Sequence, residues 1–168
     1  MQEHGLKISE LVTLFNLEVL NRGSDYDTAL LTITDVNRPG LQFHSFYDYF
    51  DPRRLQVLGK AEITYLKGLT SEQRRKCFDD LFLYDIPALV ISRGLDCFPE
   101  CLESAVQHEK TLLRTEETTV DFTSRTIEAL NRVLAPCVTR HGVLLDISGE
   151  GVMITGQNRF FWANILAM

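Results

Sequence analysis

Residues 87–94 read PALVISRG, and this stretch decides the fold class. After the proline, ALVI is a continuous apolar run, which is typical of a strand buried on both faces of a sheet. The run ends at Ser92-Arg93-Gly94, residues 99–108 then predict a helix, and Leu112-Leu113 predicts a second short strand. A strand, a helix and a strand in this order predict a right-handed βαβ crossover. The predicted fold class is therefore α/β.

The chain on either side of this unit predicts further elements of both kinds. Apolar spacing predicts a helix over 8–15, a strand over 17–20 and a half-buried strand over 31–34, with a Pro-Gly loop over 35–40. Two longer helices are predicted from capping pairs, Thr70 with Gln73 and Thr118 with Asp121. Their inward faces are predicted to be Cys77, Phe78, Leu81 and Phe82 in the first helix, and Ile127, Leu130 and Leu134 in the second.

The character of the sequence changes near Ala135. Residues 143–147 and 152–155 are apolar runs joined by SGEG, which predicts a β-hairpin. We therefore expect two domains, over 1–134 and 135–168. The tail from 160 to 168 is apolar at every position but Asn164, so we expect hairpin and tail to pack on a neighbouring subunit and form a homo-oligomer. The alternative is a disordered tail that causes aggregation.

Composition excludes several classes of protein. The chain has 168 residues, 45% of them hydrophobic and 24% charged, with a net charge of −6, which favours a globular domain over a disordered chain or a broad nucleic-acid surface. No apolar run is long enough to span a membrane, and the first seven residues lack a signal pattern. Four cysteines without paired spacing favour a reducing compartment, so we expect a cytoplasmic protein with no nucleic-acid or membrane partner.

Five stretches, taken together and in order, resemble the HPr kinase/phosphorylase family from residue 6 to Gly156. They are residues 35–41 (DVNRPGL), 47–50 (YDYF), 54–62 (RLQVLGKAE), 87–95 (PALVISRGL) and 141–147 (HGVLLDI). The family is bacterial and acts in carbon catabolite repression, where it phosphorylates a serine of HPr, the phosphocarrier of the phosphotransferase system, and reverses the reaction by phosphorolysis. The resemblance implies an N-terminal α/β domain similar to those of Mur ligases, a kinase domain that uses ATP and magnesium, HPr as partner, and assembly into oligomers.

The resemblance also implies a P-loop that begins at Gly156. That motif, G-x-x-x-x-G-K-[ST], needs glycines for a phosphate cradle, a lysine for the outer phosphates and a hydroxyl for magnesium. Phe161, Trp162 and Ala163 occupy the last three positions, so only Gly156 remains as a cofactor-binding position. His141 stands at a catalytic position of the family, and we expect it to be inert here. We therefore predict a non-catalytic fragment, from a truncated or frameshifted product, that binds no cofactor and serves assembly or regulation.

Two arginines are candidate ligand-binding residues. Arg38 and Arg93 both follow predicted strands, where α/β sheets tend to bind ligands, and Arg93 precedes a glycine and a helix. The alternative interpretation is that each arginine only holds its own loop together. If they bind a ligand, the chain is an independent small-ligand-sensing or interaction module.

Two other groups of residues have competing interpretations. Cys97 and Cys101 suggest a redox pair or half of a metal site, but zinc needs four ligands and no second pair has suitable spacing, so we predict structural thiols and no metal site. The aromatic stretch from 43 to 50 suggests a stacking platform for nucleic acid, and we instead expect a core or subunit-contact segment.

Overall fold

The computed structural model describes residues 4–136, 142–147 and 150–155 and divides into two compact units, residues 1–135 and 136–168. The first unit contains seven strands, five α-helices and one 3₁₀ helix within its described residues. In chain order these are β1 (Leu6–Lys7), α1 (Ile8–Phe15), β2 (Glu18–Asn21), β3 (Leu30–Leu31), β4 (Val36–Asn37), η1 (Gln42–His44), β5 (Leu55–Leu58), α2 (Lys60–Lys67), α3 (Ser71–Phe82), β6 (Leu89–Ile91), α4 (Pro99–Gln107), β7 (Leu112–Arg114) and α5 (Thr119–Leu134).

A mixed five-stranded sheet forms the centre of this unit. Its strand order is β2-β7-β6-β5-β4, with β4, β5, β6 and β7 mutually parallel and β2 antiparallel at one edge. Strands β1 and β3 form a separate antiparallel pair. Because the four parallel strands run in one direction, their carboxyl ends meet at one edge of the sheet, and the loops that follow them lie side by side.

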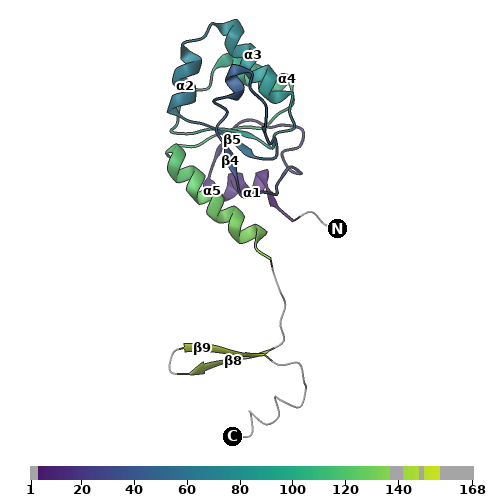
Figure 1. Ribbon diagram of the computed structural model, residues 1–168, viewed down its shortest axis with the longest axis vertical. Helices are drawn as coiled ribbons and strands as arrows, with labels where there is room; N and C mark the ends of the chain where they lie inside the picture. The colour runs from purple at the N-terminus through teal and green to yellow at the C-terminus, as the bar shows by residue number, and fades with distance from the viewer. Residues whose placement is uncertain (1–3, 137–141, 148–149, 156–168) are drawn as a thin grey trace. The chain divides into compact units, whose positions relative to one another are not determined.

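Helices cover both faces of the sheet, α2, α3 and α4 on one side and α1 and α5 on the other (Figure 1). The central strands supply apolar side chains to both layers in alternation. In β6, Leu89 and Ile91 join the core under α3, whereas Val90 joins the core beside α1 and α5. A strand covered on both faces has no solvated side, which explains why its sequence is a continuous apolar run. The predicted α/β class is confirmed.

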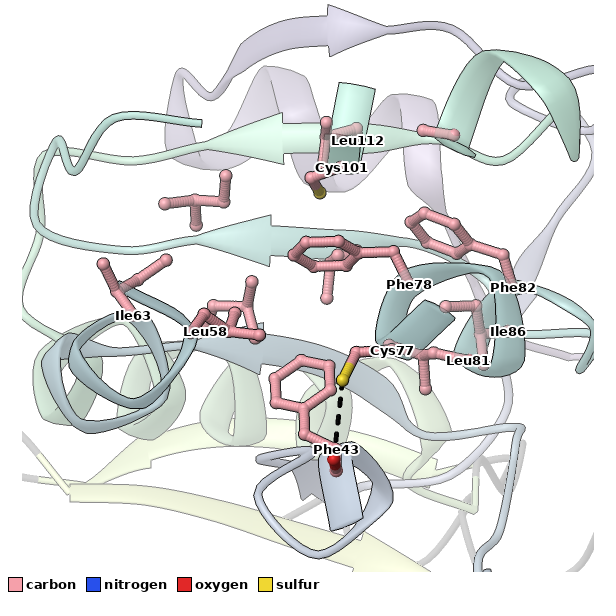
Figure 2. Packing of buried hydrophobic residues seen from close by; sticks show 14 residues of the cluster. Phe43, Leu58, Ile63, Cys77, Phe78, Leu81, Phe82, Ile86, Cys101 and Leu112 are labelled. Carbon is pink, nitrogen blue, oxygen red and sulfur yellow. Dashed lines mark hydrogen bonds between the residues drawn. The ribbon is translucent and has the colours of Figure 1, made fainter. Parts of the chain in front are cut away.

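The core beneath α3 is built around aromatic rings (Figure 2). Phe78 is fully buried, and its ring meets that of Phe43 edge-to-face at a centroid distance of 5.8 Å. The Cys77 thiol donates a hydrogen bond to the Phe43 carbonyl oxygen at 3.5 Å, which ties η1 to α3. Part of the aromatic stretch is thus core, as expected, although Tyr49 in the same stretch is fully exposed.

Several predicted elements are confirmed. The helix over 8–15, the strand near 17–20 and the β6-α4-β7 unit with its parallel pairing are all present. The capping box of α3 is also present, since the Thr70 hydroxyl accepts from the Gln73 N–H at 3.3 Å and the Gln73 side chain accepts from the Thr70 N–H at 3.0 Å.

Other predictions were wrong in detail. The strand expected over 31–34 is only β3, Leu30–Leu31, and the expected loop over 35–40 contains β4. The buried residues of α5 are Thr119, Phe122, Thr126 and Leu130, so Leu130 was predicted correctly, and Leu134 packs partly buried against the same core. Ile127 is one position off the buried face and only half-buried.

Strand β5 and helix α2 were not predicted at all. In β5 the polar Gln56 interrupts the apolar run, yet it is fully buried, because its side chain accepts from the Asn37 amide at 2.7 Å and donates to the Arg54 carbonyl at 2.6 Å. The bond from Asn37 connects β4 to β5, and the two bonds together satisfy a polar side chain inside the sheet.

In the second unit, β8 (Gly142–Ile147) and β9 (Glu150–Thr155) pair antiparallel, with Leu145 opposite Val152. That these strands begin a kinase domain stays a prediction. His141, Gly156 and the apolar tail lie outside the described residues. None of the helices that the structure describes is long and apolar enough to cross a lipid bilayer.

Candidate functional site

A cavity of about 490 Å³ lies where the parallel strands end. It is lined by Arg38, Lys60, Ala61, Thr64, Arg93, Thr119 and Val120. Arg38 directly follows β4, Lys60 follows β5 after one glycine, Arg93 follows β6 after one serine, and Thr119 begins α5 after β7. The cavity therefore occupies the carboxyl edge of the sheet, where open α/β sheets bind their ligands.

Arg38 is held at the cavity by a buried carboxylate. Its Nη2 atom lies 2.9 Å from Oε2 of Glu62, whose side chain is only 8% exposed. The same carboxylate oxygen accepts the backbone N–H of Gly59 at 2.9 Å, so Glu62 also satisfies a free N–H at the start of α2. A side chain at Gly59 would not fit, because its Cβ would lie 2.7 Å from Oγ1 of Thr119 and 3.2 Å from Arg38.

Ser92 connects three of the elements that surround the cavity. Its buried hydroxyl donates to the Leu58 carbonyl oxygen at 2.9 Å and lies 2.7 Å from Oγ1 of Thr119. The end of β5, the end of β6 and the start of α5 are thereby joined through one side chain. The hydroxyls of Ser92, Thr119 and Thr64 therefore already have protein partners.

Arg93 has an unusual backbone conformation. Its φ is +65°, and Gly94 follows with φ of +58°, so two successive residues lie in the left-handed region. For a residue other than glycine this costs on the order of 1–2 kcal/mol. Hydrogen bonds from the Arg93 N–H to the Glu117 carbonyl and from the Gly94 N–H to the Thr115 carbonyl, both at 2.8 Å, hold the turn in place. Strained residues of this kind tend to occur at functional sites.

Two of the three cations at the cavity are uncompensated. Of the side chains that the structure describes, none forms an ion pair or hydrogen bond with the Lys60 ammonium or the Arg93 guanidinium. Lys60 is the first residue of α2, where the helix dipole disfavours a positive charge. Neither charge is therefore explained by local stability, and together with Arg38 they make the cavity positively charged. Chemically, this arrangement is suited to hold an anion.

The structure thus brings Arg38 and Arg93, which are distant in sequence, to one cavity. Arg38 has a carboxylate contact, with Glu62 of α2, of the kind that the alternative interpretation expects, and none of the described side chains bonds to the Arg93 guanidinium. Ligand binding by either arginine stays a prediction. Sequence reasoning missed Lys60 and Thr119, because β5 was not recognised and the strand order was unknown. The sequence signal that could have revealed Lys60 was the Gly59-Lys60 pair, which directly follows the apolar residues Val57 and Leu58.

The cysteine pair lies elsewhere, near the start of α4. Cys101 is fully buried, and burial raises the pKa of its thiol well above the ordinary value. Cys97 is half-buried, and a hydrogen bond with the Cys101 thiol lowers the pKa of Cys97. Over the described residues, no three His, Cys, Asp or Glu side chains lie close enough together to hold a metal ion.

Comparison with known proteins places this fold in a family. Residues 6–130 match the family described as HPr Serine kinase N terminus. Among curated relatives, the HPr kinase/phosphorylase of Alkaliphilus metalliredigens is 40% identical over 153 residues, which cover 91% of this chain and 49% of the relative. That of Clostridium beijerinckii is 41% identical over 154 residues, covering 92% of this chain and 50% of the relative. The chain thus spans about half the length of these relatives.

Among solved structures, the following one has a similar fold. It is the regulatory region of Clostridium perfringens pyrophosphatase, with CBS and DRTGG domains, in complex with the activator diadenosine tetraphosphate. The TM-score is 0.54 at 14% identity, over 76% of this chain and 50% of that chain. At this identity the likeness concerns the fold alone. From the match over residues 6–130, the chain belongs to the HPr kinase/phosphorylase family and contains its N-terminal domain.

Proposed function

We propose that this chain is a non-catalytic member or fragment of the HPr kinase/phosphorylase family that serves assembly or regulation. The observation that carries the proposal is the residue at the P-loop lysine position, which is Trp162. The neighbouring glycine and hydroxyl positions hold Phe161 and Ala163. Phosphoryl transfer depends almost entirely on positioning and on stabilisation of negative charge. An indole supplies neither a cation for the outer phosphates nor a ligand for magnesium.

A transfer assay tests this proposal directly. The full chain is incubated with HPr, labelled ATP and magnesium, and the label on HPr is measured. The HPr kinase/phosphorylase of Clostridium beijerinckii serves as the positive control. We expect no label on HPr from this chain, and magnesium-dependent labelling that persists through purification to homogeneity would contradict the proposal.

Assembly is the first regulatory role that we propose. The family resemblance and the apolar tail after residue 160 both support a homo-oligomer, and the charge and cysteine content support a cytoplasmic location. The likeness to Mur ligase N-terminal domains belongs to the same proposal. Light scattering on the full chain measures its mass in solution, and a monomeric mass across the accessible concentration range would contradict the proposed assembly.

A second candidate function is the sensing of a small ligand. The specific observation in its favour is the convergence of Arg38, Lys60 and Arg93 on one cavity at the carboxyl edge of the sheet. A sensing domain needs a site and no catalytic group, which agrees with a chain that lacks the P-loop residues. The two candidates are compatible, because ligand binding in this domain would regulate whatever assembly contains it.

A further inference from the structure

We infer that the cavity between Arg38, Lys60 and Arg93 binds a small organic phosphate. This inference rests on the second proposed function, the sensing of a small ligand, and adds the chemical class of that ligand. It follows from three properties of the cavity, namely its charge, the donors that remain free in it, and its size.

Charge is the first property. Three cationic side chains line the cavity, and among the carboxylates that the structure describes only Glu62 is bonded to them, through its pair with Arg38. The surplus of positive charge is retained in a chain whose net charge is −6. A single carboxylate ligand would be matched by one arginine, whereas a phosphomonoester carries about two negative charges and three acceptor oxygens. The number of cations therefore favours phosphate over carboxylate.

The free donors are the second property. Thr64 Oγ1 donates to the Lys60 carbonyl oxygen at 2.7 Å, the hydroxyl of Thr119 is bonded to Ser92, and the Gly59 N–H is bonded to Glu62. Among the described side chains that line the cavity, the donors left for a ligand are those of the cationic groups. An arginine has five N–H donors, so Arg38 can keep its bond to Glu62 and still bind a phosphate oxygen. Arg and Lys are the side chains that bind phosphate most often, the first through its planar fork and the second as a point charge.

Size is the third property. A volume of about 490 Å³ lies within the range of small-molecule sites and exceeds what a lone phosphate group fills. Part of the wall is apolar, formed by Ala61 and by Val120, a residue that is 69% exposed at the start of α5. An apolar wall beside a cationic cluster suits a ligand with a phosphate at one end and an organic group at the other. A sugar phosphate and a nucleotide both have this chemistry.

Titration calorimetry on the full chain tests the inference with three probes. Ribose 5-phosphate and AMP share the phosphoribosyl group, and ribose lacks the phosphate. We expect binding of ribose 5-phosphate, AMP or both, and none of ribose. Tighter binding of AMP identifies a nucleotide as the ligand, and equal binding of the two identifies a sugar phosphate. Absence of binding of both phosphates at millimolar concentration, or equal binding of ribose, overturns the inference.

Two variants of equal charge test the location of the site. Lys60→Gln removes the unpaired ammonium at the start of α2, and Lys67→Gln removes an exposed ammonium at the other end of the same helix. We expect about tenfold weaker binding for Lys60→Gln, which corresponds to about 1.4 kcal/mol, and unchanged binding for Lys67→Gln. Equal weakening in both variants would mean that the anion responds to net charge only, and would overturn the inference.

Arg93→Asn provides an independent check, because asparagine tolerates a positive φ better than most residues. We again expect about tenfold weaker binding, with an unchanged circular dichroism spectrum. Unaltered binding in both Arg93→Asn and Lys60→Gln would overturn the inference. None of these outcomes depends on phosphoryl transfer to HPr, so the transfer assay of the first proposed function succeeds or fails separately.

Discussion

The ion pair between Arg74 and Glu100 connects the first turns of α3 and α4, and we expect its loss to destabilise the domain. Arg74 donates to Oε1 of Glu100 from Nη2 at 2.8 Å and from Nε at 3.2 Å. It also donates to the Leu69 carbonyl oxygen at 2.7 Å. The two side chains are only 19% and 11% exposed, so this pair is less screened by water than a surface pair.

The size of the effect follows from the pKa of Glu100. The hydrogen bonds from Arg74 are the main cause that lowers the pKa of Glu100 from its ordinary 4.5 to about 2. Because the folded-state pKa is depressed, this stabilisation is fully present above the unfolded pKa and is lost as the pH falls through the folded pKa. The shift sets an upper bound of about 3 kcal/mol at neutral pH, and screening by solvent at the helix ends reduces this to about 2 kcal/mol.

Glu100→Gln removes the charge and keeps the shape of the side chain. We expect it to lower the free energy of unfolding by about 2 kcal/mol at pH 7, and by about 1 kcal/mol near pH 3, where part of the wild-type contribution is already lost. Urea unfolding of the full chain, followed by far-ultraviolet circular dichroism, measures this difference, because the signal comes mainly from helices α1 to α5.

Glu103→Gln is the matched control. Glu103 lies one turn further along α4, and its carboxylate contacts Arg75 at 2.9 Å with 67% of its side chain exposed. An exposed pair contributes little, so we expect a loss below about 1 kcal/mol. The reasoning would be refuted if both variants lost the same stability, or if the loss in Glu100→Gln were the same at both pH values.

Three further predictions concern the cap, the core and the thiols of the first unit. Thr70→Ala removes the hydroxyl that accepts the N–H at the start of α3, so the free energy of unfolding by urea should fall by about 1 kcal/mol, and an unchanged midpoint would contradict the capping role. Phe78→Ala opens a cavity in the aromatic core and should cost about 3–5 kcal/mol in the same measurement, whereas a loss below about 1 kcal/mol would mean that the core refills. Cys97 should react with iodoacetamide at neutral pH faster than Cys77 or Cys101, because the pKa of Cys97 is lowered while burial raises the pKa of the other two thiols. Peptide mass spectrometry measures the three rates, and equal rates would contradict this order.

Local signals in the sequence determined much of the architecture. The capping pair at Thr70, the apolar face of α3 and the continuous apolar run before Ser92 each predict their element without knowledge of the rest of the chain. Each of these signals reflects contacts between residues a few positions apart or burial of a whole segment, and both properties are visible as periodicity or composition. The same reasoning singled out Arg38 and Arg93, since each follows a predicted strand or loop.

Only the tertiary structure decided which of these residues share a site. Strand β5 escaped prediction because its polar Gln56 is satisfied by Asn37 from another strand, a long-range contact that leaves no periodic trace. The order β7-β6-β5-β4 then places the residues that follow each strand around one cavity, and Lys60 enters the site only through that order. Sequence positions specify which charges exist, but strand pairing over tens of residues decides which of them converge, because parallel strands align their carboxyl ends whatever their separation along the chain.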